Sequence, residues 1–109
     1  MPEETGTAQG FAGPEEVVTI SVEPSNTISV DKRQITLSKA RGHRATWRIQ
    51  GGTTFNILFD GDSPFDQKRY DQNTAKSLKP RANAREDTYK YIVQVPRCND
   101  LDPELIVDS

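Results

Sequence analysis

The sequence has one cysteine and one histidine, and this scarcity excludes two common ways of stabilising a small domain. Cys98 has no second cysteine to pair with, so the chain forms no internal disulfide. Cys98 and His43 together provide too few nitrogen and sulfur ligands for a structural zinc site. We therefore predict a fold that is stabilised by packing alone.

The chain also lacks long apolar runs and an excess of positive charge. No stretch approaches the ~20 apolar residues needed to cross a bilayer, so no membrane association is predicted. The first sixteen residues have neither the positive start nor the apolar run of a secretion signal, and a cytoplasmic location is the default expectation. With 16 acidic and 14 basic side chains the net charge is −2, which disfavours general nucleic-acid binding.

The length of 109 residues leaves room for one domain with one hydrophobic core. Residues 1–16 are rich in glycine and glutamate, and Phe11 is their one large aromatic or aliphatic core-forming side chain. Such a segment does not recover the entropy lost on ordering, so we predict a flexible N-terminal tail over 1–16. Residues 17–109 are predicted to form a single domain.

Alternating apolar and polar residues are the main signal from position 17 onward, and they predict strands with one buried face. The clearest run is Tyr89, Tyr91, Val93 and Val95, and Trp47 is the candidate for the centre of the core. The alternation recurs in the ranges 17–23, 28–37, 43–50, 53–59, 89–95 and 105–107. About seven strands predict an all-β, two-sheet Greek-key β-sandwich, an architecture that includes immunoglobulin-like domains.

Two connections leave alternatives open. Gly51-Gly52 favours a two-residue hairpin, but that register would place Phe55 beside Arg48, on the wrong face. Either the loop has three residues, or the chain crosses between two packed sheets. Residues 60–87 show little periodicity, which predicts a long connection that is functional or contains at most one short helix near 67–78.

Three aspartates in this connection, Asp60, Asp62 and Asp66, are weak candidates for a divalent-cation site. Hard cations such as calcium prefer clustered oxygen ligands, although the spacing is not that of an EF-hand. A turn in which the aspartates accept backbone hydrogen bonds explains the same residues and is favoured. A small-ligand or divalent-cation domain using these aspartates is therefore the alternative function.

The same connection carries the basic concentration of the chain, which makes it the candidate contact surface. Loops held on rigid sheets often carry recognition, so we predict a noncatalytic module that binds a protein partner. The predicted partner-binding residues are Lys68, Arg69, Tyr70, Lys76, Lys79 and Arg81. For the basic residues taken alone, a solvated loop compensated by the nearby acidic residues Glu86 and Asp87 is the favoured interpretation.

An enzyme is disfavoured because no base, nucleophile and charge stabiliser can be placed together from the sequence. Self-association is also predicted as an option, because exposed strand edges present unpaired backbone groups that favour a homodimer.

The order of strands in cupredoxin-like domains is similar to that of three stretches of this chain, GHRATWRIQGGTTFNILFDGDSPF, DTYKYIVQV and DPELIVD. More narrowly, the chain resembles the DP-EP family of small bacterial proteins of unknown function. The resemblance is carried by Glu23-Pro24 and by Asp102-Pro103-Glu104.

The resemblance to cupredoxins implies a copper site whose last ligands lie in the loop 96–101. In that loop Cys98 has no histidine or methionine after it, and Asn56 stands where the earlier strand is expected to provide a histidine. His43 lies at the start of another strand. A blue-copper site needs imidazole ligands, so copper electron transfer is disfavoured and no cofactor is predicted.

Overall fold

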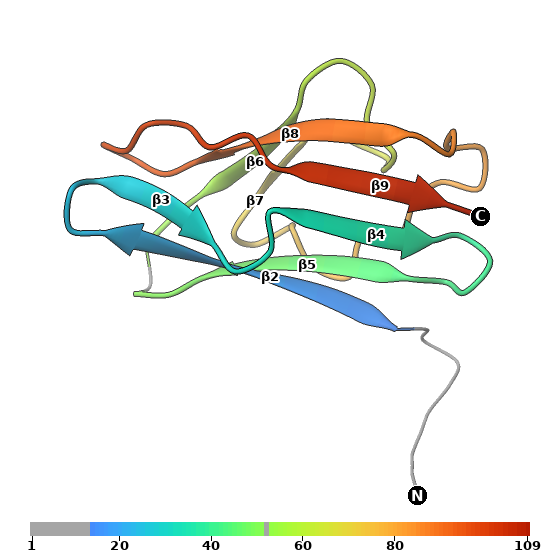
Figure 1. Cartoon of the computed structure of the whole chain (residues 1–109), viewed down its shortest axis with the longest axis horizontal. Helices are drawn as coiled ribbons and strands as arrows, with labels where there is room; N and C mark the ends of the chain where they lie inside the picture. Colours follow the sequence, from blue (N-terminus) through green and yellow to red (C-terminus); the bar gives the residue numbers. More distant parts are fainter. Residues whose placement is uncertain (1–13, 52) are drawn as a thin grey trace, which may run out of the picture.

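The computed structural model describes residues 14–51 and 53–109, which form eight strands and no helix (Figure 1). The described part of the chain thus has no helix that could cross a membrane. The strands are β2 (Glu15–Glu23), β3 (Thr27–Val30), β4 (Gln34–Ser38), β5 (Arg44–Ile49), β6 (Asn56–Phe59), β7 (Arg69–Asp71), β8 (Thr88–Gln94) and β9 (Glu104–Asp108).

The strands lie in two packed sheets, which confirms the predicted all-β sandwich. The three-stranded sheet has the order β3-β2-β5, in which β2 is antiparallel to β3 and parallel to β5. The five-stranded sheet has the order β4-β9-β8-β6-β7. Here β4 and β9 are parallel and the other neighbours are antiparallel. The central strand of the three-stranded sheet, β2, therefore pairs with the next strand of the chain, β3, and with the more distant β5.

The two connections that change sheets explain the patterns that the sequence left open. The chain crosses from β5 to β6 between the sheets, which confirms the crossing and rules out a hairpin there. It also crosses between β3 and β4, where the polar residues 31–34 interrupt the alternation. Asp31 fixes this crossing, because its carboxylate accepts a hydrogen bond from the Thr19 amide at 2.8 Å and its own amide donates to the Thr19 carbonyl at 3.1 Å.

The core fills the space between the sheets with the alternating residues that the sequence predicts to face inward. Trp47, Phe55 and Tyr91 are all buried. The Trp47 and Tyr91 rings pack edge to face, with centroids 5.4 Å apart and planes at 75°. Such edge-to-face pairs are favourable beyond the area that they bury. The prediction of Trp47 as a central core residue is confirmed.

The connection 60–87 is predicted to contain at most one short helix near 67–78, and the structure has no helix there. The chain instead forms the short strand β7, a turn over 72–74 and an extended stretch that runs beside β5. Asp71 favours the turn, because its carboxylate accepts hydrogen bonds from the amides of Asn73 at 2.8 Å and Thr74 at 3.1 Å. These hydrogen bonds hold the pKa of Asp71 below its usual range.

The predicted start of the first strand at residue 17 is also wrong, because β2 begins at Glu15. Parallel pairing with β5 extends the strand backward, with Glu15 opposite Arg44 and Glu16 opposite Ala45. Glu16 forms an ion pair of 3.4 Å with Lys32. Backbone pairing with β5 thus places Glu15 and Glu16 in a strand, although the polar composition of this segment predicts a flexible tail. The remainder of the predicted flexible tail, residues 1–13, lies outside the described residues.

Candidate functional site

The long connection from 60 to 87 is anchored in the core by its few apolar residues. Phe65 is 2% exposed, and its ring lies 6.3 Å from that of Trp47 and 5.6 Å from that of Phe59. Ser63 is buried as well, and its hydroxyl accepts from the Phe65 amide at 3.1 Å and donates to the Gln67 carbonyl at 2.7 Å. The connection is therefore a packed part of the domain with a fixed backbone.

Residues 75–78 of the connection cover the outer edge of β5. The amides of Ala45 and Trp47 donate to the carbonyls of Leu78 and Ala75, each at 2.8 Å. The Leu78 amide returns a hydrogen bond to the Ala45 carbonyl at 2.8 Å. This pairing removes one edge from the strand-mediated self-association that the sequence predicts. Within the described residues, β3, β4 and β7 remain as terminal strands of the two sheets.

Tyr70 is a core residue, so its prediction as a partner-binding residue is wrong. Its side chain is 6% exposed, its ring lies 6.2 Å from that of Phe65, and its hydroxyl accepts a hydrogen bond from the Gln67 amide at 2.9 Å. Burial raises the pKa of the Tyr70 phenol. Its neighbours Lys68 and Arg69 are exposed. Side chains alternate between the two faces of β7, so Tyr70 is buried while Arg69 before it is exposed. A strand of three residues is too short for this alternation to be recognised in the sequence.

Two of the predicted basic residues, Lys79 and Arg81, meet Lys39 around a pocket of about 600 Å³. Asp66 is the single carboxylate in its lining, and we call this feature the cationic pocket. Lys39 comes from the connection between β4 and β5, so the pocket joins two distant segments of the chain. Lys76, which is exposed, does not line it. Sequence reasoning missed Lys39 because only the fold brings it beside residues 79–81.

Two of the pocket's cations are held in place by the protein. The Lys39 ammonium donates to the Ala84 carbonyl at 2.7 Å. The Arg81 guanidinium donates to the Ser63 carbonyl and lies 3.6 Å from the Asp62 carboxylate. Its Nε is a buried nitrogen with no hydrogen-bond partner among the described residues. The fold thus fixes the positions of two positive charges at this end of the sandwich.

The three aspartates proposed as cation ligands do not come together at one place. Asp62 pairs with Arg81 and accepts a hydrogen bond from the Ser63 amide at 2.9 Å, as the favoured turn interpretation predicts. Asp66 lines the cationic pocket, whereas Asp60 and Asp62 both line a different depression, together with Asp87. In residues 14–51 and 53–109, no three histidine, cysteine, aspartate or glutamate side chains come together as metal ligands.

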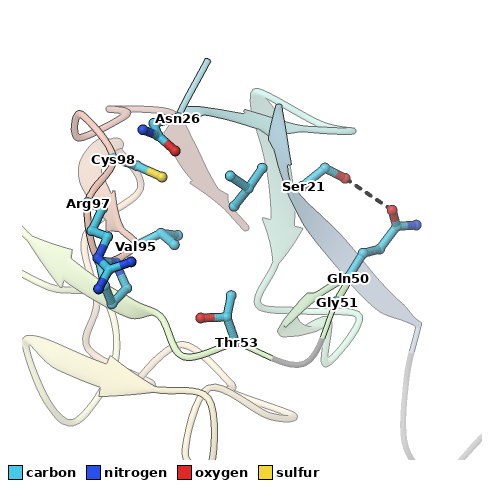
Figure 2. Close-up of a pocket in the computed structure, with 10 residues that line it drawn as sticks. Ser21, Asn26, Gln50, Gly51, Thr53, Val95, Arg97 and Cys98 are labelled. Atoms are coloured by element: carbon cyan, nitrogen blue, oxygen red, sulfur yellow. Dashed lines mark hydrogen bonds between the residues drawn. The ribbon is translucent and has the colours of Figure 1, made fainter. Parts of the chain in front are cut away.

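A second pocket, of about 460 Å³, lies at the opposite end of the sandwich, and we call it the end pocket (Figure 2). It is formed by the end of β2 and the turn that follows it, by residues 50, 51 and 53 after β5, and by the turn after β8. Its lining includes Val22, Asn26, Val95, Arg97 and Cys98. The sequence gives no pattern for this pocket, because its lining comes from three distant segments that only the fold brings together.

The chain's one histidine and one cysteine are at opposite ends of the sandwich. His43 lies between β4 and β5, where its Nδ1 accepts a hydrogen bond from the Ser38 amide at 2.7 Å. Cys98 lies after β8, in the end pocket. Because they lie at opposite ends, these two side chains cannot bind one metal ion together.

Comparisons with protein-family models, curated proteins and solved structures found no match for this chain. The resemblances to cupredoxin-like domains and to the DP-EP family stay predictions. The function is therefore argued from the geometry of the two pockets.

Proposed function

We propose that this domain is a noncatalytic interaction module that holds an acidic segment of a protein partner in the cationic pocket. The observation that carries the proposal is the meeting of Lys39, Lys79 and Arg81 around one cavity with a single carboxylate, Asp66. The whole chain has a net charge of −2, so this local excess of positive charge runs against its overall composition. Complementary charge steers association and selects partners.

The rigidity of the pocket supports binding by a preformed surface. The Arg81 amide donates to the Pro64 carbonyl at 2.8 Å, and the neighbouring Phe65 is fixed in the core. Lys39 is tied to residue 84 across the same end of the sandwich. Groups that are already ordered lose less entropy on binding, so more of the charge attraction remains as affinity.

The chemistry of the lining favours an acidic peptide over a catalytic role or a nucleic acid. Lysine, arginine and aspartate side chains provide charge here, with no paired nucleophile and base. None of the described residues that line the pocket is aromatic, so they offer no stacking platform for bases. Carboxylates suit the guanidinium of Arg81 and the two ammonium groups.

The proposal is tested with a fluorescein-labelled peptide of about eight glutamates, whose binding is followed by fluorescence anisotropy at low and high salt. Lys79→Glu reverses one charge in the pocket and is expected to weaken binding roughly tenfold, which corresponds to about 1.4 kcal/mol. Lys76→Glu makes the same change in net charge on an exposed lysine outside the pocket, and is expected to bind almost as the unmodified protein does.

Equal losses in the two variants would assign the binding to net charge and reject the pocket. A labelled oligothymidylate that bound as tightly as the peptide would also reject a protein partner in favour of any polyanion. Point substitutions are the suitable test, because deleting the connection would expose the edge of β5 and remove Phe65 from the core.

A further inference from the structure

We propose that the end pocket is a second binding site, and that it takes a small organic acid whose carboxylate pairs with Arg97 while its apolar part packs on Val22 and Val95. This site goes beyond the proposed function, because it lies at the other end of the sandwich and is made of other residues. Its argument rests on an exposed apolar wall, an isolated charge and an unfavourable turn residue.

The apolar wall is provided by Val22, which is 40% exposed. It is the large hydrophobic side chain that stays exposed in the described part of the chain, and this exposure is in the end pocket. Val95, which is 6% exposed, reaches the same pocket from the turn after β8 (Figure 2). Apolar surface that faces a cavity gains free energy when a ligand removes it from water.

The charge in the pocket comes from Arg97, and no carboxylate is part of the described lining. Arg97 is exposed, and its guanidinium has no hydrogen bond or ion pair with any residue that the structure describes. Asn26 and Thr53 add neutral polar groups to the lining (Figure 2). An unpaired guanidinium beside an apolar wall is suited to a ligand with one carboxylate and an apolar body.

The backbone at Arg97 shows that an arginine here has an energetic cost. The Cys98 amide donates to the Val95 carbonyl at 3.1 Å, which closes a four-residue turn with Pro96 at its second position. Arg97 occupies the third position with φ at +70°, as in a type II turn, where glycine or asparagine is preferred. A left-handed non-glycine residue costs about 1 kcal/mol. Among the described residues, no hydrogen bond or ion pair of the Arg97 side chain offsets this cost, so we assign the arginine to ligand binding.

The size of the pocket and the flanking turns agree with a small molecule. A volume of about 460 Å³ lies in the usual range of small-ligand pockets, which is about 300–1,000 Å³. Asn26, which also lines the pocket, is left-handed as well, with φ at +60°, and its amide closes the turn between β2 and β3 by donating to the Glu23 carbonyl at 3.0 Å. Asparagine tolerates this conformation, which leaves Arg97 as the unfavourable residue of the pair.

Cys98 reports on occupancy, because it is the chain's one thiol and lines the pocket. The probe is phenylacetate, and the measurement is the rate at which Cys98 reacts with a disulfide reagent such as DTNB. At about ten times its dissociation constant, phenylacetate should slow this reaction roughly tenfold, as expected for a ligand that covers the thiol. Phenylacetamide has the same shape without the charge and should protect Cys98 much less. Titration calorimetry gives an independent measure of binding.

Two variants separate the charge from the apolar wall. Arg97→Asn removes the guanidinium with a residue that accepts a left-handed backbone, and it should abolish protection by phenylacetate relative to its own rate without ligand. Val22→Thr keeps the branched shape that suits β2 and should weaken phenylacetate binding because it replaces an apolar methyl with a hydroxyl.

The proposal is overturned if phenylacetate gives neither protection nor heat up to its solubility limit, or if phenylacetamide protects equally well. It is also overturned if N-acetyl-Ala-Ala-Phe binds at least tenfold more tightly than phenylacetate, since a polypeptide C-terminus would then be the ligand. These outcomes are independent of the glutamate-peptide test, because Lys79→Glu leaves the end pocket unchanged and Arg97→Asn leaves the cationic pocket unchanged.

Discussion

The indole Nε1 of Trp47 donates a hydrogen bond of 3.2 Å to the hydroxyl of Tyr91, and this bond joins the two sheets inside the core. Trp47 lies on β5 in the three-stranded sheet, and Tyr91 lies on β8 in the five-stranded sheet. Both side chains are almost completely buried. The Tyr91 oxygen satisfies the indole donor, so the largest side chain of the core packs without an unpaired N–H.

Tyr91→Phe is expected to lower the free energy of unfolding by about 1–3 kcal/mol, because it leaves the buried Trp47 donor without a partner. Guanidinium unfolding followed by tryptophan fluorescence measures this change. Tyr89→Phe is the matched control. The Tyr89 hydroxyl donates to the Arg85 carbonyl at 2.8 Å in a less buried position, where water can replace it. A Tyr89 variant as unstable as the Tyr91 variant would contradict the special role of the Trp47 bond.

Alkaline pH should destabilise the domain through the same tyrosine. Burial raises the pKa of Tyr91 from 10.0 to about 12, so the folded state holds its proton where the unfolded state has released it. This stabilisation is complete below pH 10.0 and is lost as the pH rises toward 12. By about pH 11 this group alone should lower stability by about 1.4 kcal/mol.

The measurement compares the free energy of unfolding at about pH 8 and about pH 11 in the unmodified protein and in Tyr91→Phe. The variant has no hydroxyl at this position, so its loss between the two pH values should be smaller. The pKa of Tyr70 is also raised by burial, which leaves part of the alkaline loss in the variant. Identical losses in both proteins would exclude Tyr91 as a cause.

Phe65→Ala is expected to lower stability by about 3–5 kcal/mol, although this residue belongs to a long irregular connection. Its ring contacts those of Trp47, Phe59 and Tyr70, so truncation leaves a cavity between the connection and both sheets. Lys76→Ala, an exposed change in the same connection, should alter stability by no more than about 0.5 kcal/mol. Thermal or urea unfolding of both variants provides the comparison, and a small loss for Phe65→Ala would mean that the connection is not anchored there.

The sequence predicts most of the core because alternation is a local signal. Tyr91 and Trp47 each stand in a run where every second side chain faces inward, and both are buried. Residues 75–78 carry no such signal, since their order comes from backbone hydrogen bonds to β5 and not from side-chain burial in a regular strand. The edge of β5 therefore orders residues 75–78 through backbone hydrogen bonds, which the periodicity of the side chains could not predict.

The candidate sites were harder to predict for a related reason. Lys79 and Arg81 are two positions apart in the sequence and were predicted together, but Lys39 joins them only through the fold. Arg97 follows a proline in a turn, and the sequence does not show that its backbone is left-handed. Local composition therefore located two of the three cations of the cationic pocket and did not locate the end pocket.

The covered edge of β5 gives a last prediction about association. Leu78→Pro removes the amide that donates to the Ala45 carbonyl, leaves that buried acceptor unpaired and should lower stability by about 1–3 kcal/mol. The uncovered edge should then pair between molecules, so light scattering should show a mass that rises with protein concentration. Leu78→Ala retains the amide and should keep the mass of the unmodified protein despite its lost side chain. Association of both variants to the same extent would attribute the effect to side-chain loss and not to the strand edge.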